Sequence, residues 1–169
     1  MRVAIITGAA QGIGRRTAEV LGEAGYALLL LDLQRCEATL SALREAGSEA
    51  EALVGDITDE AVIAKAVSHV AQRWGRADVL VNNAGVSFIA AAETVEASAF
   101  RRVLEVNLVA PFVLSRAFGS LMLEQRHGSI VNVASIAGLV GVSDRTAYNA
   151  SKHGLIGLTR TPLRLPISF

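Results

Sequence analysis

The sequence predicts an α/β fold, a doubly wound parallel sheet of about five strands in one domain. Short apolar runs alternate with longer segments of helical period, and this alternation occurs five times. Strands that are apolar throughout are typical of a parallel sheet covered by helices on both faces. The chain of 169 residues is long enough to bury the core of one such domain, and it shows no linker, repeat or low-complexity segment.

The first two strands are predicted from β-branched and leucine-rich runs. Val3 to Ile6 is the first run, and it ends at a glycine loop that opens a helix from Gly12 to Ala24. Ala27 to Leu31 is the second run, and a segment of helical period follows it from Arg35 to Ala46. These elements form the first two of the five repeats.

The remaining three repeats follow the same alternation. Right-handed crossovers between their strands give a sheet in which ligands bind beyond the carboxyl ends of the strands, near the switch in strand order. We expect strands at residues 51–54, 79–81 and 129–133, and helices at residues 60–74, 97–125 and 146–159.

Composition excludes several classes of function. Sixteen acidic residues balance sixteen basic ones, and the arginines are scattered without interleaved aromatic residues, so we expect no nucleic-acid partner. Cys36 is the only cysteine, which excludes an internal disulfide. The histidines do not have the spacing of metal ligands, so we expect no metal site; they are His69, His127 and His153.

Membrane insertion and export are not expected either. The longest apolar runs, such as Ala27 to Leu31, are far shorter than a membrane span. The N-terminus reaches a glycine turn before the apolar region of a signal peptide could develop. We therefore expect a cytoplasmic protein.

The glycine loop after the first strand is the first candidate site. Gly8 permits a tight turn, Gly12 and Gly14 allow a pyrophosphate to approach the main chain, and the helix N-terminus supplies unpaired N–H groups. Strand, loop, helix and second strand follow within about thirty residues, as in a Rossmann dinucleotide site. The alternative is that these glycines only pack the helix against the strand. The loop residues that we expect to bind a cofactor are Gly8, Gln11, Gly12, Ile13 and Gly14.

Asp32 ends the second strand and indicates which dinucleotide binds. A carboxylate there can accept hydrogen bonds from both hydroxyls of an adenosine ribose but repels a 2′-phosphate, so NAD is favoured over NADP. Arg35 is close enough in sequence to soften this preference. The alternative is that Asp32 only caps the next helix.

Tyr148 and Lys152 form the second candidate site. Lys152 is one of only two lysines in the chain, and on a helix it shares a face with Tyr148. A tyrosine with a pKa of about 10 is a poor base near neutral pH, and a neighbouring ammonium favours its phenolate form. Tyr148 could then exchange the proton of a substrate hydroxyl. The alternative is a half-buried tyrosine beside a solvated lysine.

Five motifs together resemble the short-chain dehydrogenase/reductase family. They are Thr7-Gly8-x-x-x-Gly12-Ile13-Gly14, Asn82-Asn83-Ala84-Gly85, Asn107, Ser135 and Tyr148-x-x-x-Lys152, and they occur in the family's order and spacing. The resemblance covers residues 1 to about 160. It is closest to 3-oxoacyl-carrier-protein reductases and to sugar or alcohol dehydrogenases.

This resemblance implies an oxidoreductase that transfers a hydride between NAD(H) and a secondary alcohol or ketone. Tyr148 would be the acid/base, and Lys152 would lower its pKa and bind the nicotinamide ribose. Ser135 would hold the substrate oxygen, and Asn107 would hold a water molecule next to Lys152. The alternatives are a turn or cap role for Ser135 and a backbone-satisfying role at a helix kink for Asn107.

The resemblance also implies further contacts with the cofactor. Asp56 and Ile57 would contact the adenine, and Asn83, Ala84 and Gly85 would lie along the cofactor. The alternatives are that Asp56 starts a turn before the next helix and that Asn83 is a turn residue. The resemblance also implies a homo-oligomer, a dimer or tetramer, because the helices of the family's usual dimer face, at residues 97–125 and 148–159, are present.

The chain departs from the family after Arg160. The family continues with two strands, a helix and a mobile loop, whereas here a tail with two prolines occupies residues 161–169. We expect the helix to break near Thr161 and the fifth strand to become a sheet edge. One hypothesis is therefore a truncated product, with a shifted reading frame in its last residues, that binds a dinucleotide without useful turnover. Residues 136–145 are apolar up to Asp144, which indicates a partly hydrophobic substrate.

Overall fold

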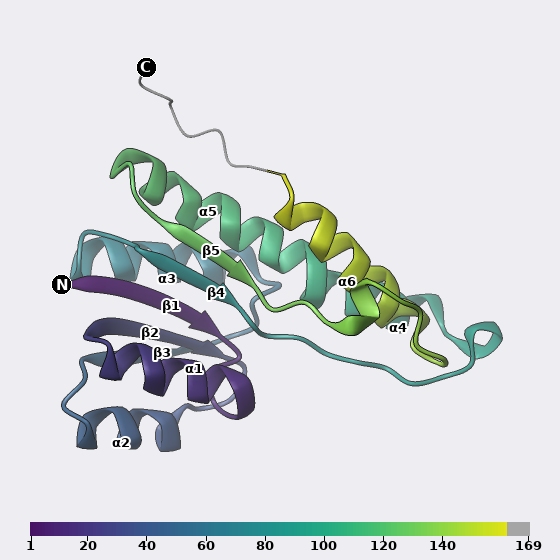
Figure 1. Ribbon diagram of the computed structural model, residues 1–169, viewed down its shortest axis with the longest axis horizontal. Helices are drawn as coiled ribbons and strands as arrows, with labels where there is room; N and C mark the ends of the chain where they lie inside the picture. The colour runs from purple at the N-terminus through teal and green to yellow at the C-terminus, as the bar shows by residue number, and fades with distance from the viewer. Residues whose placement is uncertain (162–169) are drawn as a thin grey trace.

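A computed structural model describes residues 1–161 and confirms the predicted fold class (Figure 1). Five parallel strands form one sheet in the order β3-β2-β1-β4-β5. Helices follow the strands along the chain, as in a doubly wound α/β fold. The strands are β1 (Arg2–Thr7), β2 (Tyr26–Asp32), β3 (Ala50–Val54), β4 (Val79–Asn82) and β5 (Ser129–Asn132). The α-helices are α1 (Gly12–Glu23), α2 (Glu37–Glu45), α3 (Glu60–Arg73), α4 (Ala97–Leu104), α5 (Ala110–Glu124) and α6 (Thr146–Thr159).

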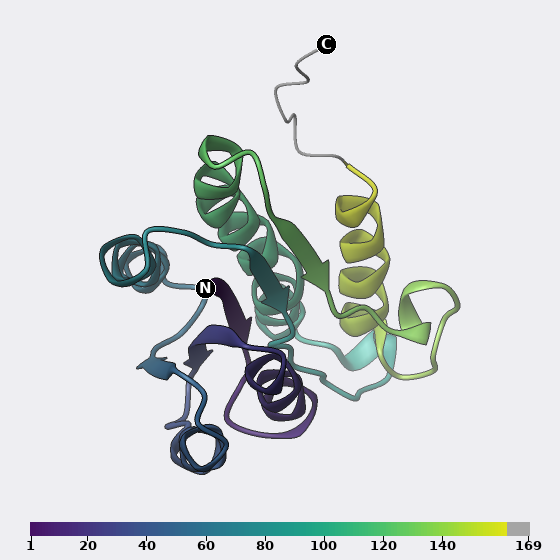
Figure 2. The same cartoon turned by 60° about the vertical axis from the view of Figure 1, so that its left-hand side comes forward.

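Alternate residues of β1 enter two separate cores, because successive strand side chains point to opposite faces. Val3 and Ile5 pack with α3 and α5, whereas Ala4 and Ile6 pack with α1 and α2. Figure 2 shows these two helical layers on opposite sides of the sheet. Both faces of the central strand are therefore dry, which explains its uninterrupted apolar sequence.

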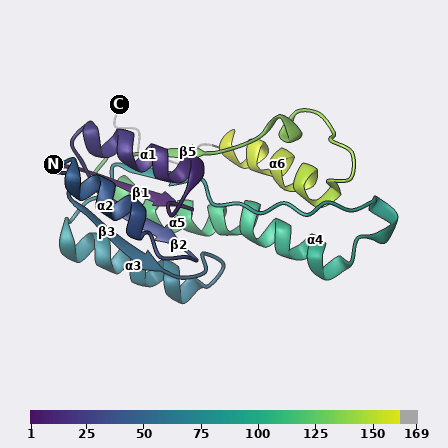
Figure 3. The same ribbon diagram turned by 90° about the horizontal axis from the view of Figure 1, so that it is seen from below.

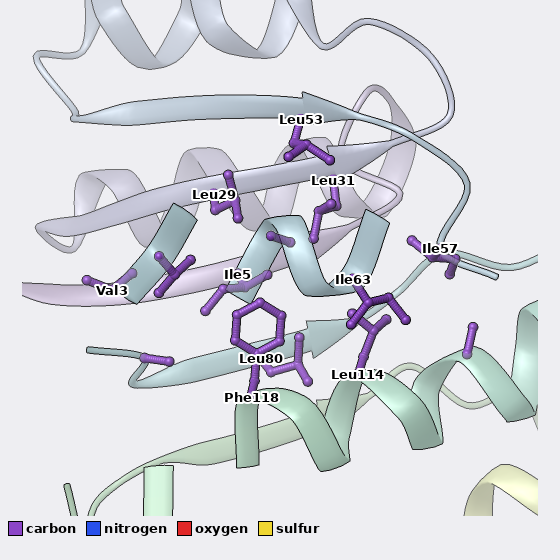
Figure 4. Close-up of a cluster of buried hydrophobic side chains, with 14 of the residues drawn as sticks. Val3, Ile5, Leu29, Leu31, Leu53, Ile57, Ile63, Leu80, Leu114 and Phe118 are labelled. Carbon is purple, nitrogen blue, oxygen red and sulfur yellow. The ribbon is translucent and has the colours of Figure 1, made fainter. Parts of the chain in front are cut away.

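Phe118 of α5 is the largest side chain that is fully buried. It lies over the sheet beside Leu80 of β4 and Ile5 of β1, and Leu114 lies one turn away on the same helix face (Figure 4). Burying an aromatic side chain of this size stabilises a fold by about 3 kcal/mol. This core fixes α5 against β4 and so positions the segment that precedes α5.

The segment between α4 and α5 differs from the single helix that we predicted. Residues Glu105–Val109 form a π-helical turn, η2, between two α-helices. Pro111 lies at the start of α5 and has no backbone N–H, so the α-helical hydrogen bond to the carbonyl of Asn107 cannot form. Such π-turns recur at functional sites, and this one contains Asn107.

Two short 3-10 helices, η1 (Ala92–Thr94) and η3 (Ile136–Gly138), lie in the loops after β4 and β5. α6 packs against α4, η2 and η3 at the β5 side of the molecule (Figure 3). Residues that follow two neighbouring strands therefore meet near the N-terminal half of α6.

β5 lies at an edge of the sheet among the described residues, as expected from its place as the last strand. Half of the Val131 surface, 46%, is exposed there. α6 ends at Thr159, close to the break that we predicted near Thr161. The predicted tail extends to residue 169, and its residues 162–169 lie outside the described part of the chain.

One helical segment has the length and composition of a membrane span, although the sequence runs considered above were much shorter. It is Ala97–Glu124, in which α4, η2 and α5 are continuous. Leu114, Phe118 and Met122 of this segment belong to the core on the sheet. In this structure the segment is therefore a core helix.

Candidate active site

A cavity of about 300 Å³ opens at the carboxyl ends of β1, β2, β3 and β4. The chain leaves β1 toward β2 and later returns to add β4 on the other side, so the strand order switches here, where α/β sheets bind ligands. Most of the predicted cofactor residues meet at this cavity. Those that line it are Gly8, Gln11, Asp32, Asp56, Ile57, Asn83, Ala84 and Gly85.

The glycine loop is packed too tightly to accept other side chains at two positions. Gly8 has a φ of +68°, which L-residues rarely adopt. A Cβ added to Gly14 would lie 2.0 Å from the Gly8 carbonyl oxygen and 2.6 Å from Nδ2 of Asn83. Gly14 therefore packs the start of α1 against the Gly8 backbone and the Asn83 side chain, and both of these residues line the cavity.

The N-terminus of α1 is the natural site for an anion. Its N-cap residue, Gln11, makes no side-chain hydrogen bond to the first turn, so the protein leaves those N–H groups uncapped. Gly12 and Ile13 are exposed at this end, and Ile13 is 66% exposed. Neither residue lines the cavity itself, nor does Gly14.

Asp32 connects the end of β2 to the glycine loop. Its Oδ2 accepts a hydrogen bond from the Ala10 N–H at 2.9 Å, and its Oδ1 accepts one from the Gln34 N–H at 2.9 Å. Asp32 does not cap α2, whose N-cap is Cys36. Each carboxylate oxygen accepts one hydrogen bond and keeps further acceptor capacity, and Asp32 lines the cavity.

Asp56 follows β3 and is held by two neighbours. Its Oδ1 accepts hydrogen bonds from the Thr58 N–H at 2.9 Å and the Thr58 hydroxyl at 2.8 Å, and its Oδ2 accepts one from Arg102 Nη2 at 2.8 Å. Burial raises the pKa of Asp56, but these hydrogen bonds and the arginine charge outweigh it, so the pKa lies below its ordinary value. Asp56 also starts the turn before α3, because its carbonyl accepts the Asp59 N–H.

Arg102, from α4, also lines the cavity and was missed by the sequence reasoning. No local motif marks it, because its partner lies 46 residues earlier in the chain. The only signal in the sequence that could have pointed to Arg102 was its place on the predicted helix, five residues before Asn107.

The loop after β4 is fastened to the end of β1. The Asn83 and Ala84 N–H groups both donate to the Thr7 hydroxyl at 3.0 Å. The Asn83 side chain donates to the carbonyls of Thr7 at 2.9 Å and Gly8 at 3.1 Å. Asn83 is therefore more than a turn residue, since it joins two strand ends at the cavity.

Tyr148 and Lys152 share one face of α6, as predicted. The Lys152 ammonium lies 5.7 Å from the centre of the Tyr148 ring. Lys152 is only 4% exposed, and its Nζ donates to the Val133 carbonyl at 2.7 Å. Burial lowers the pKa of Lys152. The lysine is thus anchored in the protein interior and is not solvated, so the alternative that we left open for it is wrong.

Asn107 connects the π-turn to the loop after β4. Its Oδ1 accepts the Val86 N–H at 2.8 Å, and its Nδ2 donates to the Val86 carbonyl at 2.9 Å and to the Ser151 hydroxyl at 3.1 Å. A Cβ added to Gly85 would lie 3.3 Å from Oδ1 of Asn107 and 3.8 Å from Nζ of Lys152. Gly85 also lines the cavity, so it is the point at which the cavity meets Lys152.

Ser135 lies three residues beyond the end of β5, because the ladder ends at Asn132, one residue before the predicted end of the strand at Val133. Its Oγ accepts a hydrogen bond from the Ala137 N–H at 3.2 Å, so it caps η3. The hydroxyl proton is not used in that bond, which leaves Ser135 able to donate to another oxygen.

The donor set fits a dinucleotide. A glycine cradle that a Cβ would fill, an uncapped helix N-terminus and a strand-end carboxylate occur together at the switch in strand order. Within residues 1–161 no group of three or more His, Cys, Asp or Glu side chains is placed to hold a metal ion.

Solved structures of similar proteins contain such cofactors. The chain superposes on NAD⁺-bound xylitol dehydrogenase with a TM-score of 0.90 and 38% identity, covering 94% of this chain and 62% of that one. It superposes on a metagenomic short-chain oxidoreductase in complex with NADP with a TM-score of 0.88 and 39% identity, covering 93% and 71%. A nicotinamide dinucleotide cofactor is thereby supported, without a choice between the two forms.

Sequence relatives give the same family. The chain is 40% identical over 161 residues to the uncharacterized oxidoreductase YxjF of Bacillus subtilis, and the match covers 94% of this chain but 63% of that protein. The chain thus spans about three fifths of the length of the relatives it matches. The family model described as short chain dehydrogenase matches residues 2–164. The chain therefore belongs to the short-chain dehydrogenase/reductase family.

Proposed function

We propose that this chain carries the dinucleotide-binding and proton-exchanging parts of an oxidoreductase that interconverts a secondary alcohol and a ketone. One observation carries the proposal: Gly85 lines the cavity beneath the glycine loop and also lies against Asn107 and Lys152. A cofactor laid along that cavity would reach the tyrosine helix at Gly85.

NAD is the proposed cofactor. Asp32 presents a carboxylate to the cavity, and the one arginine among the lining residues, Arg102, is already paired with Asp56. A 2′-phosphate would meet a negative charge without a free positive charge to offset it. Arg35 does not line the cavity, and its side chain is 82% exposed.

Tyr148 is proposed to exchange the substrate proton. When bound, the nicotinamide supplies or accepts the hydride at the alcohol carbon. Lys152 places its ammonium 5.7 Å from the centre of the phenol ring, and the Val133 carbonyl fixes the lysine there. Ser135 would donate to the substrate oxygen, and Asn107 would keep the Gly85–Val86 backbone in place next to Lys152.

The substrate is proposed to be a neutral, partly hydrophobic alcohol or ketone. Ile136, Leu139 and Val140 follow Ser135 and are 54–66% exposed. No charged residue occurs between them and Ser135. The family's small-molecule substrates are diverse, so the compound itself is left to assay.

A homo-oligomer is also proposed. Val109 and Phe112 lie on the outer side of the long helix and are 38% and 47% exposed. Burying these side chains against a second copy would remove apolar surface from water. Light scattering with a Phe112→Ser variant checks this.

The test of the function combines binding with turnover. NADH is titrated by fluorescence, and a panel of secondary alcohols and ketones is assayed, with wild type, Tyr148→Phe and Tyr26→Phe. We expect Tyr148→Phe to lose about 10²- to 10⁴-fold in turnover while it binds NADH normally. Tyr26→Phe, at the far end of β2, should keep both properties. Retained turnover in Tyr148→Phe would remove this tyrosine from the mechanism.

The cofactor preference has its own test. NADH should bind more tightly than NADPH, and Asp32→Asn should narrow the difference by removing the charge. Asp59→Asn is the matched control, because Asp59 caps α3 and does not line the cavity. Tighter binding of NADPH by wild type would contradict the role of Asp32.

A second function is a dinucleotide-binding fragment without useful turnover. The observation that favours it is the exposure of the reacting end, where Ile136 and Leu139 are 66% and 64% exposed. NADH binding with no turnover of any panel compound selects this function.

A further inference from the structure

Arg102 crosses from α4 to the loop after β3 and makes two hydrogen bonds there. Nη2 donates to Asp56 Oδ2 at 2.8 Å, and Nη1 donates to the Thr58 hydroxyl at 2.9 Å. The Thr58 hydroxyl in turn donates to Asp56 Oδ1. The three side chains thus form a closed ring that fixes both oxygens of one carboxylate.

The ring leaves Asp56 with a single free acceptor position. Oδ1 receives two hydrogen bonds, from the N–H and the hydroxyl of Thr58, so both of its lone pairs are occupied. Oδ2 receives one, from Arg102, and keeps one lone pair. Asp56 and Arg102 both line the cavity, and the three hydrogen bonds to Asp56 restrict rotation of its carboxylate there.

Charge in the cavity also depends on Arg102. The charged residues among its lining are Asp32, Asp56 and Arg102. Without the arginine, two carboxylates would face a ligand that carries a pyrophosphate, and their repulsion would oppose binding. With it, the charge of the Asp56 carboxylate is offset at Oδ2, the oxygen that keeps the free lone pair.

We propose that Arg102 is a positioning residue that makes the cavity selective for adenine over bases that lack a 6-amino group. The proposal rests on the dinucleotide-binding function proposed above. An adenine amino group can donate to the free lone pair of Asp56 Oδ2, whereas hypoxanthine presents a carbonyl oxygen at the same place. Two acceptors facing each other repel, so the fixed carboxylate rejects hypoxanthine.

The ion pair between Arg102 and Asp56 contributes little to the stability of the fold by itself. Arg102 and Asp56 side chains are 49% and 35% exposed, and ion pairs with such exposure change stability only slightly. Removal of Arg102 should therefore leave the fold nearly unchanged and act on base selectivity, since it frees the carboxylate to rotate.

The experiment compares NADH with its deamino analogue, in which hypoxanthine replaces adenine. Dissociation constants are measured by calorimetry for wild type, Arg102→Ala, Arg102→Lys and Thr58→Val. Wild type should prefer NADH by about tenfold, the effect of one hydrogen bond to a charged acceptor. Arg102→Ala should bind both more weakly and prefer NADH by no more than about twofold. Arg102→Lys should recover affinity through its charge, but only part of the selectivity.

Arg101→Ala is the matched control. Arg101 is the neighbouring arginine on α4, is exposed, and its side chain makes no hydrogen bond or ion pair within residues 1–161. It should keep the wild-type preference. Thr58→Val removes the other side of the ring and should lower selectivity without a change in charge, which keeps the test valid if Arg102→Ala folds poorly.

Failure of this proposal is distinct from failure of the proposed function. If wild type binds NADH and Arg102→Ala, Arg102→Lys and Thr58→Val all keep the full preference for adenine, Arg102 is not a positioning residue. If wild type binds neither dinucleotide, the proposed function itself is wrong, and the role of Arg102 is wrong with it.

Discussion

The proposed adenosine end, at the cavity, and the proposed reacting end, at η3 and α6, are built differently. At the proposed adenosine end, Asn83, Asp32 and Asp56 each make at least two hydrogen bonds to other residues of the protein. At the reacting end, the Tyr148 hydroxyl makes no hydrogen bond to residues 1–161, and Ser135 Oγ accepts only one. One end is fixed before any ligand binds, whereas the other keeps its polar groups free.

This difference follows from which residues make each end. The adenosine end consists of turns directly after β1, β2, β3 and β4, where the strand ladders fix the backbone. The reacting end depends on η3 and α6, which pack on α4 and η2 beside the sheet edge. Preorganisation lowers the cost of binding, so cofactor binding should survive changes that abolish turnover.

Lys152→Met should give the largest difference between the two ends, because it should greatly lower turnover and leave binding at the adenosine end intact. Turnover should fall by at least about 10²-fold, because the ammonium beside the tyrosine ring is lost. The variant also leaves the Val133 carbonyl without its buried donor. Affinity for ADP, which carries neither the nicotinamide nor its ribose, should change by less than about twofold, since the adenosine end does not contact Lys152. Calorimetry with ADP and NADH measures both effects; an equal loss for the two ligands would contradict the separation.

Gly14→Ala should damage the adenosine end next most strongly. The added Cβ would meet the Gly8 carbonyl oxygen and Asn83 Nδ2, and such overpacking costs about 1–3 kcal/mol. Both the affinity for NADH and the free energy of unfolding should fall, and urea denaturation measures the free energy of unfolding. Gly157→Ala in α6 is the control, because its Cβ would meet nothing within 4 Å and alanine favours a helix by about 1 kcal/mol. Equal stability of the two variants would show that the loop relaxes around Gly14.

The sequence predicted the adenosine end better than the reacting end. Apolar strands and a glycine loop are local signals, and Gly8, Asp32 and Asn83 lie where those signals placed them. The fifth strand was predicted to extend to Val133, which still resembles a strand residue, but the ladder stops at Asn132. Ser135 therefore lies one residue farther beyond the strand than predicted. The strand ended early because its pairing partner, β4, also ends at Asn82.

Two features required three-dimensional information. The π-turn at Asn107 arises from Pro111 two residues after Val109, in a segment whose apolar period otherwise predicts one helix. The pairing of Arg102 with Asp56 joins positions 46 residues apart. Neither a repeat period nor a short motif carries that kind of information.

pH should act on the two ends in separate ranges. The lowered pKa of Asp56 contributes stability that is present above its ordinary value, about 3.9, and is lost as pH falls through the folded value. The lowered pKa of Lys152 has a different consequence, because burial penalises the charged form. Burial of the charged lysine destabilises the fold. That lost stability is regained as pH rises from the pKa of Lys152 in the folded state to its ordinary pKa, about 10.4.

Unfolding free energies measured against pH for wild type, Asp56→Asn and Lys152→Met check these two ranges. The difference between wild type and Asp56→Asn should change only in acid. The difference between wild type and Lys152→Met should change as pH rises toward the ordinary lysine pKa of about 10.4 and stay constant in acid. A change of this difference in the acidic range would show that the lysine is not the group that titrates.

Arg35→Ala should have the smallest effect and sharpens the assignment of the adenosine end. Arg35 is 82% exposed, and its nearest ion-pair partner is Glu37 at 3.9 Å, a contact worth little in water. Because it does not line the cavity, its removal should change the ratio of NADH to NADPH affinity by less than about twofold. Fluorescence titration of both cofactors measures that ratio. A larger shift would mean that Arg35 reaches the ribose when a cofactor binds, and Asp32 would then share control of the preference with it.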